Sequence, residues 1–238
     1  MEKNGIWEEY WKVAAFMVDT DQRIRLRSMA DVFQELANNH ANYWNVGFER
    51  MKSSGRFWVL NRQAIEFLTW PHWEQPLRVE SWISMMKGPF SLRHFAAFNE
   101  SDEVMVKASY LWTSIDHATK KPIAYPAGDF PIVEERDFDL PRPYKFRLSG
   151  EPIASQTYTV RDSDLDIIGH TNNAIYLEWV TNAIHSMEID IQKIDANYVG
   201  ESFLGEEIAI TILGNEDGKH AATITNSKDL ELFRMIIS

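Results

Sequence analysis

The sequence has no cysteine, no surplus of basic residues and no long apolar run. Without cysteine the chain can form no disulfide, no thiolate metal site and no cysteine nucleophile. The 24 Lys and Arg face 35 Asp and Glu, giving a net charge of −11. This balance disfavours a general nucleic-acid binder, because neutralising phosphates needs an excess of positive charge. It disfavours binding to an anionic membrane surface for the same reason.

Membrane insertion and secretion also find no support in the sequence. No stretch reaches the roughly 18 apolar residues of a membrane span, and the start MEKNGIWEEYWK has neither the basic nor the apolar region of a signal peptide. A cytoplasmic location is therefore expected. With 238 residues, 45% of them hydrophobic, the chain can bury one large core or two cores of roughly 120 residues each.

The N-terminal half reads as one long helix among strands. A strand is expected over residues 11–18, and a helix from Ser28 to a stop at Gly47. The apolar positions of this helix recur at helical spacing and are Met29, Val32, Phe33, Leu36, Ala37, Ala41 and Trp44. Runs rich in β-branched and aromatic residues predict further strands at 57–68, 77–86, 91–98 and 104–115.

The segment from His117 to about Pro152 differs from the rest in its high proline content. Its prolines are Pro122, Pro126, Pro131, Pro141, Pro143 and Pro152. Proline lacks a backbone N–H and fixes φ, so this segment suits an extended connector better than a helix or a central strand. The expected domains are residues 1–145, which include most of this connector, and residues 146–238.

The C-terminal half repeats the order of strand, helix and strands. A strand is expected at 156–161, followed by a helix whose apolar stripe runs from Ile175 to Ile184. Later strands are expected at 195–199, 207–213, 220–225 and 230–237, with a hairpin at Asn215, Asp217 and Gly218.

Sliding one half of the sequence over the other indicates an internal duplication. One register aligns the pairs Asp21–Asp164, Phe33–Tyr176, Leu36–Trp179 and Ala37–Val180. In this register Arg23 and Arg27 stand opposite Asp166 and His170. An Asp/His site would therefore belong to the C-terminal unit alone.

Asp166 and His170 lie just before the second helix. A carboxylate that orients an imidazole, beside a helix N-terminus that attracts developing negative charge, suits acyl chemistry. The same residues also suit a turn with a helix cap, because Asp, Gly, Thr and Asn are ordinary turn and N-cap residues. The spacing alone leaves both interpretations open.

Several long motifs resemble the acyl-ACP thioesterases of bacteria and plastids, and the resemblance covers nearly the whole chain. In the N-terminal half they are LRSMADVFQELANNHANYWNVGF (26–48), FWVLNRQAIEF (57–67), VESW (79–82) and ASYLWTSIDHATKKP (108–122). In the C-terminal half they are DLDIIGHTNNAIYLEW (164–179) and NYVGES (197–202).

The resemblance implies an α+β fold, a tandem (double) hot-dog in which each unit is a long helix wrapped by a curved antiparallel β-sheet. It implies hydrolysis of fatty acyl-ACP to free fatty acid and ACP, which terminates fatty acid synthesis. The expected partner is acyl carrier protein carrying a fatty acyl-phosphopantetheine, with no nucleic acid, no membrane span, no cofactor and no metal; a homodimer is left open. The alternatives are an acyl-CoA thioesterase and a catalytically silent acyl-thioester-binding hot-dog protein. An enoyl-thioester hydratase is disfavoured, because the Tyr-x-x-Glu segment matches the thioesterases.

Carried over by position, the catalytic residues of the resembled family are Asp166, His170 and Glu201. Asp166 or Glu201 would activate water or attack the thioester directly, and His170 would orient water or exchange protons. Two positions depart from the family pattern: Ile168 stands where the family has Asn, and Ser202 stands where it often has Cys. The expected mechanism therefore uses carboxylates, imidazole and water.

Other roles are predicted for residues around this group. Backbone N–H groups of Thr171, Asn172 and Asn173 are expected to polarise the thioester carbonyl. By resemblance, Trp58 and Leu60 are expected to line the acyl channel. The segment 200–205 looks like a serine nucleophile elbow with one residue too many, which makes a serine hydrolase a weak alternative.

Two further expectations concern the N-terminal half. His40, on the first helix, is predicted to be a core or capping histidine rather than a ligand. The resemblance also implies that the carrier protein is acidic, so a local basic patch is needed for docking. The alternating run Arg23, Arg25 and Arg27 is the candidate, with a solvated strand edge as the alternative.

Overall fold

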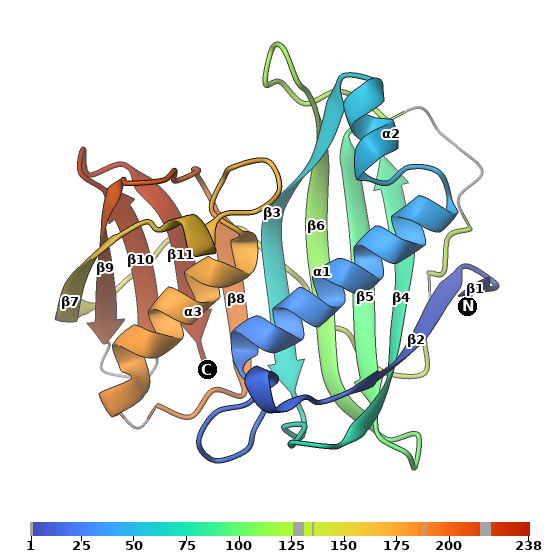
Figure 1. The fold of residues 1–238 in the computed structure, drawn as a ribbon, viewed down its shortest axis with the longest axis horizontal. Helices are drawn as coiled ribbons and strands as arrows, with labels where there is room; N and C mark the ends of the chain where they lie inside the picture. The colour runs from blue at the N-terminus through green and yellow to red at the C-terminus, as the bar shows by residue number, and fades with distance from the viewer. Residues whose placement is uncertain (1, 126–130, 135, 188, 215–219) are drawn as a thin grey trace. The chain divides into compact units, whose positions relative to one another are not determined.

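The computed structural model describes residues 2–125, 131–134, 136–187, 189–214 and 220–238. The chain forms two compact units, Met1–Pro143 and Tyr144–Ser238, called unit 1 and unit 2 below. In each unit a long helix lies across one face of an antiparallel sheet (Figure 1). This is the α+β arrangement that the sequence predicts.

Unit 1 contains the longer helix and the longer strands. Its elements are β1 (Glu2–Lys3), β2 (Ile6–Lys12), the 3-10 turn η1 (Ala15–Met17), α1 (Leu26–Tyr43), α2 (Phe48–Ser53), β3 (Arg56–Phe67), β4 (Pro76–Lys87), β5 (Phe90–Phe98) and β6 (Val104–Asp116). Within this unit the strands lie side by side in the order β1-β2-β4-β5-β6-β3.

Unit 2 has the same plan in a shorter form. Its elements are β7 (Glu151–Thr159), η2 (Asp162–Asp164), α3 (Asn173–Ile184), η3 (His185–Met187), β8 (Lys193–Tyr198), β9 (Glu207–Gly214), β10 (His220–Asn226) and β11 (Glu231–Ile237). Its strand order is β7-β9-β10-β11-β8, which matches β2-β4-β5-β6-β3 of unit 1 element by element. The duplication predicted from the sequence is therefore present in the topology.

The register in which the two units correspond differs from the one predicted. The bridge Val18–Ile24 in unit 1 corresponds to the bridge Leu165–Thr171 in unit 2, so the predicted pairing of Asp21 with Asp164 is wrong. The two registers differ by close to one helical turn, which is about 3.6 residues. The apolar faces of two amphipathic helices therefore still coincide after such a slip, and periodicity alone could not detect it.

The predicted strand at residues 11–18 is also displaced. β2 spans Ile6–Lys12 and pairs with β4 from Ile6–Trp82 to Lys12–Pro76. The chain then turns through η1, where Met17 N donates to Ala14 O at 2.9 Å. The apolar residues after Lys12 are buried by this turn rather than by a strand, and Val13 and Met17 are 1% and 6% exposed.

Helix α1 packs its apolar stripe on the sheet of unit 1. Phe33 stacks on Phe95 of β5 with 4.9 Å between ring centroids, and it meets Tyr110 of β6 edge-on at 6.4 Å. The face of the sheet that α1 covers is called the inner face below. In unit 2, Tyr176 of α3 stacks on Phe233 of β11 at 5.4 Å in the same manner.

Part of the proline-rich connector covers the outer face of the unit 1 sheet, opposite α1. Val133, Phe138 and Leu140 pack against buried Trp82 and Phe98. The guanidinium of Arg136 lies 4.5 Å from the Trp82 ring centroid, in cation–π geometry. The connector from residue 131 to Pro143 is therefore part of unit 1.

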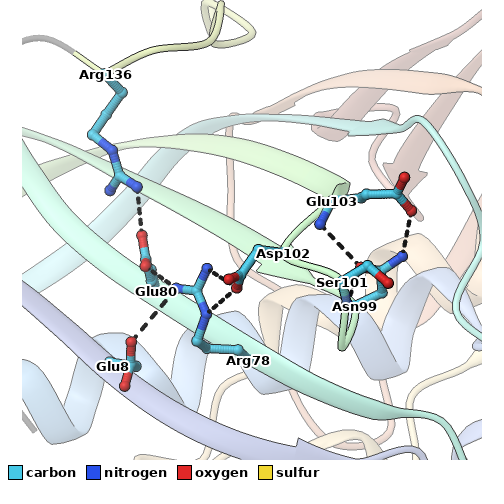
Figure 2. Close-up of polar contacts among 8 residues, drawn as sticks. All are labelled: Glu8, Arg78, Glu80, Asn99, Ser101, Asp102, Glu103 and Arg136. Atoms are coloured by element: carbon cyan, nitrogen blue, oxygen red, sulfur yellow. Dashed lines mark hydrogen bonds and ion pairs between the residues drawn. The ribbon is translucent and has the colours of Figure 1, made fainter.

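Ion pairs hold this connector in place (Figure 2). Arg136 Nη2 lies 2.7 Å from Glu80 Oε2, and Arg78 pairs with the other oxygen of Glu80. Arg78 also reaches Asp102 at 3.0 Å and Glu8 at 3.5 Å. Each of these two outer-face arginines thus has a carboxylate partner, as a charge shielded from water requires.

In the turn between β5 and β6, Asn99 Oδ1 accepts hydrogen bonds from the backbone N–H groups of Ser101 at 2.9 Å and Glu103 at 3.0 Å (Figure 2). The predicted hairpin at Asn215, Asp217 and Gly218 lies outside the described residues. Among the helices that the structure describes, none has the length and apolar character to cross a membrane.

Candidate active site

Asp166 closes a tight loop that ends at His170. Its Oδ1 accepts backbone hydrogen bonds from Ile168 N at 2.9 Å and His170 N at 3.2 Å. The backbone completes the loop, because Asp166 N donates to His170 O at 2.8 Å. Gly169 adopts φ +81°, a left-handed conformation that glycine reaches without steric cost. The side chain of Asp166 thus holds the backbone that carries His170.

The described partner of the His170 imidazole is Glu201, which comes from the loop after β8. His170 Nδ1 lies 3.2 Å from Glu201 Oε1, and the side chains are 26% and 51% exposed. Asp166 was expected from the sequence to orient this ring; the structure gives that position to Glu201. A carboxylate accepts, so the imidazole tautomer with its proton on Nδ1 suits this contact and leaves Nε2 as an acceptor.

Ser202 ties the loop carrying Glu201 to the loop carrying His170. Ser202 Oγ lies 2.8 Å from Thr171 Oγ1 and 2.8 Å from Tyr176 Oη, and Ser202 O accepts from Thr171 N at 3.0 Å. The serine is 0% exposed. This position rules against the nucleophile-elbow alternative, because the hydroxyl is buried among structural hydrogen bonds. The positioning role of Ser202 was not predicted, because nothing in the sequence marks Tyr176 as its partner.

The helix start differs from the expected oxyanion site. Thr171 N donates to Ser202 O, and Asn172 N donates to Asp164 O at 2.9 Å. Both N–H groups therefore have backbone partners within the fold, and their binding of a thioester carbonyl stays a prediction. The side chain of Asn172 caps α3 by accepting from Ala174 N at 2.9 Å. Asn173 is the first residue of α3, and its carbonyl accepts from Tyr198 Oη at 2.9 Å.

Apolar side chains are exposed on the same two loops. Phe203 approaches the His170 ring edge-on at 5.1 Å and is 47% exposed. The exposed apolar residues of these loops are Ile167 (84%), Ile168 (43%), Val199 (52%), Phe203 and Leu204 (60%). We call them the apolar rim. Exposed apolar groups gathered beside a titratable pair are typical of a site for an apolar ligand.

Unit 1 contains a copy of this loop without its imidazole. Asp19 Oδ1 accepts from Asp21 N and Arg23 N, both at 2.9 Å, as Asp166 Oδ1 does from Ile168 N and His170 N. Asp19 N donates to Arg23 O at 2.9 Å, which repeats the bond from Asp166 N to His170 O. In the structural register Asp19 thus corresponds to Asp166, and Arg23 to His170.

The second loop is also duplicated. Ile24 N donates to Pro71 O at 2.8 Å, as Thr171 N donates to Ser202 O. Trp70, the residue before Pro71, therefore takes the place of Glu201. Arg23 lies over the Trp70 ring at 5.8 Å where unit 2 has the His170–Glu201 pair. The aspartate is common to both loops, while the imidazole and its carboxylate occur in unit 2 alone.

The remaining predicted residues are placed as follows. Ile168 sits in the loop closed by Asp166, with its side chain exposed. Trp58 and Leu60 belong to β3 of unit 1; Leu60 is 2% exposed, and Trp58 lies 5.5 Å from Tyr125, ring to ring. Their role in acyl binding stays a prediction.

Comparisons with curated proteins and family models agree on one family. The model of the acyl-ACP thioesterase N-terminal domain matches residues 4–127, and the C-terminal domain model matches residues 150–237. An acyl-[acyl-carrier-protein] hydrolase of Cuphea viscosissima is 22% identical over 208 residues, covering 79% of this chain and 50% of that protein. An oleoyl-acyl carrier protein thioesterase of Coriandrum sativum is 23% identical, covering 94% and 69%. The chain spans about half the length of several of the curated relatives that it matches.

Solved structures share the fold. An acyl-ACP thioesterase from Bacteroides thetaiotaomicron superposes with a TM-score of 0.87 at 24% identity, covering 98% of this chain and 97% of that one. A 12:0-ACP thioesterase from Umbellularia californica gives 0.83 at 18% identity, covering 100% and 98%. The tandem hot-dog fold predicted from the sequence is thus confirmed. Because the two family models together match most of its length, the chain belongs to the acyl-ACP thioesterase family.

Proposed function

We propose that this protein hydrolyses the thioester between a fatty acyl group and acyl carrier protein, releasing the free fatty acid. The observation that carries the proposal is the contact between His170 Nδ1 and Glu201 Oε1 at 3.2 Å, flanked by the apolar rim. A carboxylate–imidazole pair supplies a base, and exposed apolar side chains suit a substrate with an alkyl chain.

In this mechanism His170 acts through Nε2. A water molecule attacks the thioester carbonyl carbon while Nε2 takes one of its protons, and Glu201 stabilises the imidazolium that results. The tetrahedral intermediate then collapses, the carbon–sulfur bond breaks, and Nε2–H returns the proton to the leaving thiolate. The products are a carboxylic acid and the free thiol of the carrier, so atoms and charge balance. The positive end of the α3 dipole favours the developing oxyanion.

Asp166 is a positioning residue in this proposal. Its Oδ1 holds the backbone of His170, and Asp19 does the same for Arg23 in a loop without an imidazole. The same carboxylate–backbone hydrogen bonds occur in a loop with the catalytic base and in a loop without it. Their role is therefore to hold the loop in its conformation. Ser202 has a related role, since its hydrogen bonds to Thr171 and Tyr176 fix the segment that carries Glu201.

Docking of an acidic carrier needs exposed cations. The run Arg23, Arg25 and Arg27 is a poor candidate, because Arg23 lies 3.8 Å from Asp19 and 3.6 Å from Asp21, and Arg27 lies 3.4 Å from Asp31.

A better candidate for the docking surface is the end of unit 1 where α2, the start of β3 and the end of β6 meet (Figure 1). Its exposed basic residues, which we call the basic end, are Arg50, Lys52, Lys87, Lys120 and Lys121.

The direct test is thiol release from acyl-ACP by the purified protein. His170→Gln and Glu201→Gln should each lower kcat by roughly 10²- to 10⁴-fold, the range for loss of general acid–base catalysis. His185→Gln, an exposed histidine at the far end of α3, is the matched control and should leave kcat unchanged. Near-normal turnover by both site variants would reject the assignment.

The same assay separates the alternatives. Higher kcat/KM for acyl-CoA than for acyl-ACP of equal chain length would favour an acyl-CoA thioesterase. Tight acyl-ACP binding without thiol release would favour a silent binding protein. Graded acyl chain lengths would then define which chains the protein accepts.

A further inference from the structure

Strand β7 forms a free edge of the unit 2 sheet. Among the described strands it pairs with β9 alone, and it comes last in the strand order (Figure 1). Seven of its nine residues are exposed. The backbone N–H and C=O groups on the free side of such a strand have no ladder partner, so a strand of another chain can pair with them.

The hydrogen bonds just after β7 show which of its backbone groups face the free side. Val160 N donates to Glu206 O at 2.9 Å, and Gly205 N donates to Val160 O at 2.9 Å. The backbone groups of Val160 therefore point towards the β9 side. In an antiparallel ladder, the groups of alternate residues point to the same neighbour. The residues of β7 whose backbone groups point away from β9 are therefore Ser155, Thr157 and Thr159.

The edge of the unit 1 sheet at β2 is protected in two ways that β7 lacks. The two-residue strand β1 pairs with the start of β2, and the charged residues Glu8, Glu9 and Lys12 follow along β2. Very short edge strands and charged side chains keep a sheet edge from pairing with other chains. By contrast, there is no charged residue between Glu151, at the start of β7, and Arg161, just after its end.

The free edge of β7 is complementary to itself. In an antiparallel pair of two β7 strands centred on Gln156, Ser155 stands opposite Thr157 of the second copy. Both residues have outward backbone groups, so they can exchange two N–H···O bonds. The two-fold symmetry repeats this pair, which gives about four backbone hydrogen bonds. Serine and threonine side chains opposite each other also stabilise a sheet. A bulge between Pro152 and Ala154 limits the regular pairing to residues 154–159.

The charges at the two ends of the edge favour the same register. With Gln156 at the centre, Glu151 comes to the level of Arg161 of the second copy, and the symmetry repeats this match. A shift of two residues would keep outward backbone groups opposite each other but would lose the match of charges. Opposite charges across a strand pair stabilise it, while like charges destabilise it. Glu151 and Arg161 are both exposed, so their attraction selects the register more than it adds affinity.

We propose that the free edge of β7 binds the same edge of a second copy of this chain, so that the unit 2 sheets of the two copies join into one antiparallel sheet. A second copy is the occupant because the edge matches itself in backbone groups, in side-chain pairs and in charge. The paired segment is short, so the dissociation constant should be on the order of 10 µM. The edge includes none of the residues assigned to hydrolysis, so the pairing does not depend on the proposed function.

The test is sedimentation velocity from about 1 to about 300 µM protein, a range that brackets this constant. We expect the unmodified protein to change from monomer to dimer across the range. Thr157→Pro removes an outward N–H, at an edge position where a fold tolerates proline, and should raise the dissociation constant at least tenfold. Thr157→Val keeps the N–H and should stay within about threefold of the unmodified protein. A protein that is monomeric throughout, or equal dimerisation by Thr157→Pro and Thr157→Val, would overturn the proposal.

An exchange of charges tests the register without a proline. Glu151→Lys and Arg161→Glu each bring like charges to the same level, so each variant alone should dimerise more weakly than the unmodified protein. Mixed in equal amounts, the two variants restore both attractive pairs, and a heterodimer tighter than either homodimer should form. If Thr157→Pro does not fold, as judged by circular dichroism, this mixture decides. A mixture with no more dimer than the separate variants would overturn the proposal, because the dimer would then use another surface.

Discussion

The Asp166→Asn variant tests whether the Asp166 carboxylate only holds the loop in its conformation or also takes part in the reaction. An asparagine keeps an Oδ1 that can accept from Ile168 N and His170 N, the two bonds that Asp166 makes at 2.9 and 3.2 Å. The substitution removes the negative charge. The contribution of each hydrogen bond to stability then falls from roughly 1.5–3 kcal/mol to about 1 kcal/mol. The loop would be weakened by about 1–4 kcal/mol in total, with its geometry retained.

Asp166→Asn should therefore reduce kcat for acyl-ACP by no more than roughly tenfold, provided that the loop remains closed. Asp166→Ala removes both acceptors and should reduce kcat much further. If Asp166 instead attacked the thioester or activated water, the asparagine amide could not replace it, because an amide is a much weaker nucleophile and base than a carboxylate. The kcat of Asp166→Asn would then fall by more than about 10³-fold. The assay is thiol release under single-turnover conditions.

Asp19→Asn in unit 1 is the matched control, since Asp19 makes the same two bonds in the loop that lacks the imidazole. It should lower thermal stability about as much as Asp166→Asn and leave kcat unchanged. If Asp166→Asn folds but is as inactive as Asp166→Ala, the positioning role is refuted and Asp166 is a catalytic residue.

Three other variants test separate parts of the structure. Ser202→Ala leaves Tyr176 Oη without its hydroxyl partner and should lower the free energy of unfolding by about 1–3 kcal/mol in urea denaturation; an unchanged value would contradict its positioning role. Charge reversal of Lys120 and Lys121 together should raise KM for acyl-ACP and leave KM for a small acyl thioester unchanged, while equal effects on both substrates would remove the basic end as a docking surface. Burial lowers the pKa of His94 to about 4 from 6.5, so the unfolded chain binds its proton first and stability should fall by about 2 kcal/mol between pH 6.5 and 5; His94→Gln should flatten that fall, and an identical pH profile would show that His94 has no part in it.

The family motif in the sequence, together with hydrophobic periodicity, was enough to predict the tandem α+β fold. Helix α1 follows directly from the spacing of Met29, Phe33 and Leu36, and most strands of each unit fall close to their expected ranges. Strand β7 is an exception, because it begins at Glu151 rather than at residue 156 and so includes Pro152, which was assigned to the connector. The first strand was displaced because Val13 and Met17 are apolar yet buried by a turn. Periodicity reports which residues are buried, without saying what buries them.

The candidate site was only partly predictable for a related reason. His170 and Glu201 were named from the family motif, and both lie in the observed pair. Glu201, and not the expected Asp166, lies at the imidazole. The N–H groups of Thr171 and Asn172 have backbone partners that local spacing does not reveal. Ser202 O and Asp164 O already accept from those N–H groups.

By itself, the sequence determined the fold class, the family and the residue types available for chemistry, with no thiol among them. These properties can be read from composition, from local periodicity and from motifs, none of which requires knowing which distant residues are in contact. The tertiary structure decided which groups meet: the distant Glu201 rather than the nearby Asp166 at the imidazole, and Arg93 against His40 on the inner face of unit 1. It also corrected the register of the two halves, so that the bridge Val18–Ile24 matches Leu165–Thr171. Long-range contacts depend on how loops and strands pair in space, and a helix face tolerates a slip of one turn that a hydrogen-bonded loop does not.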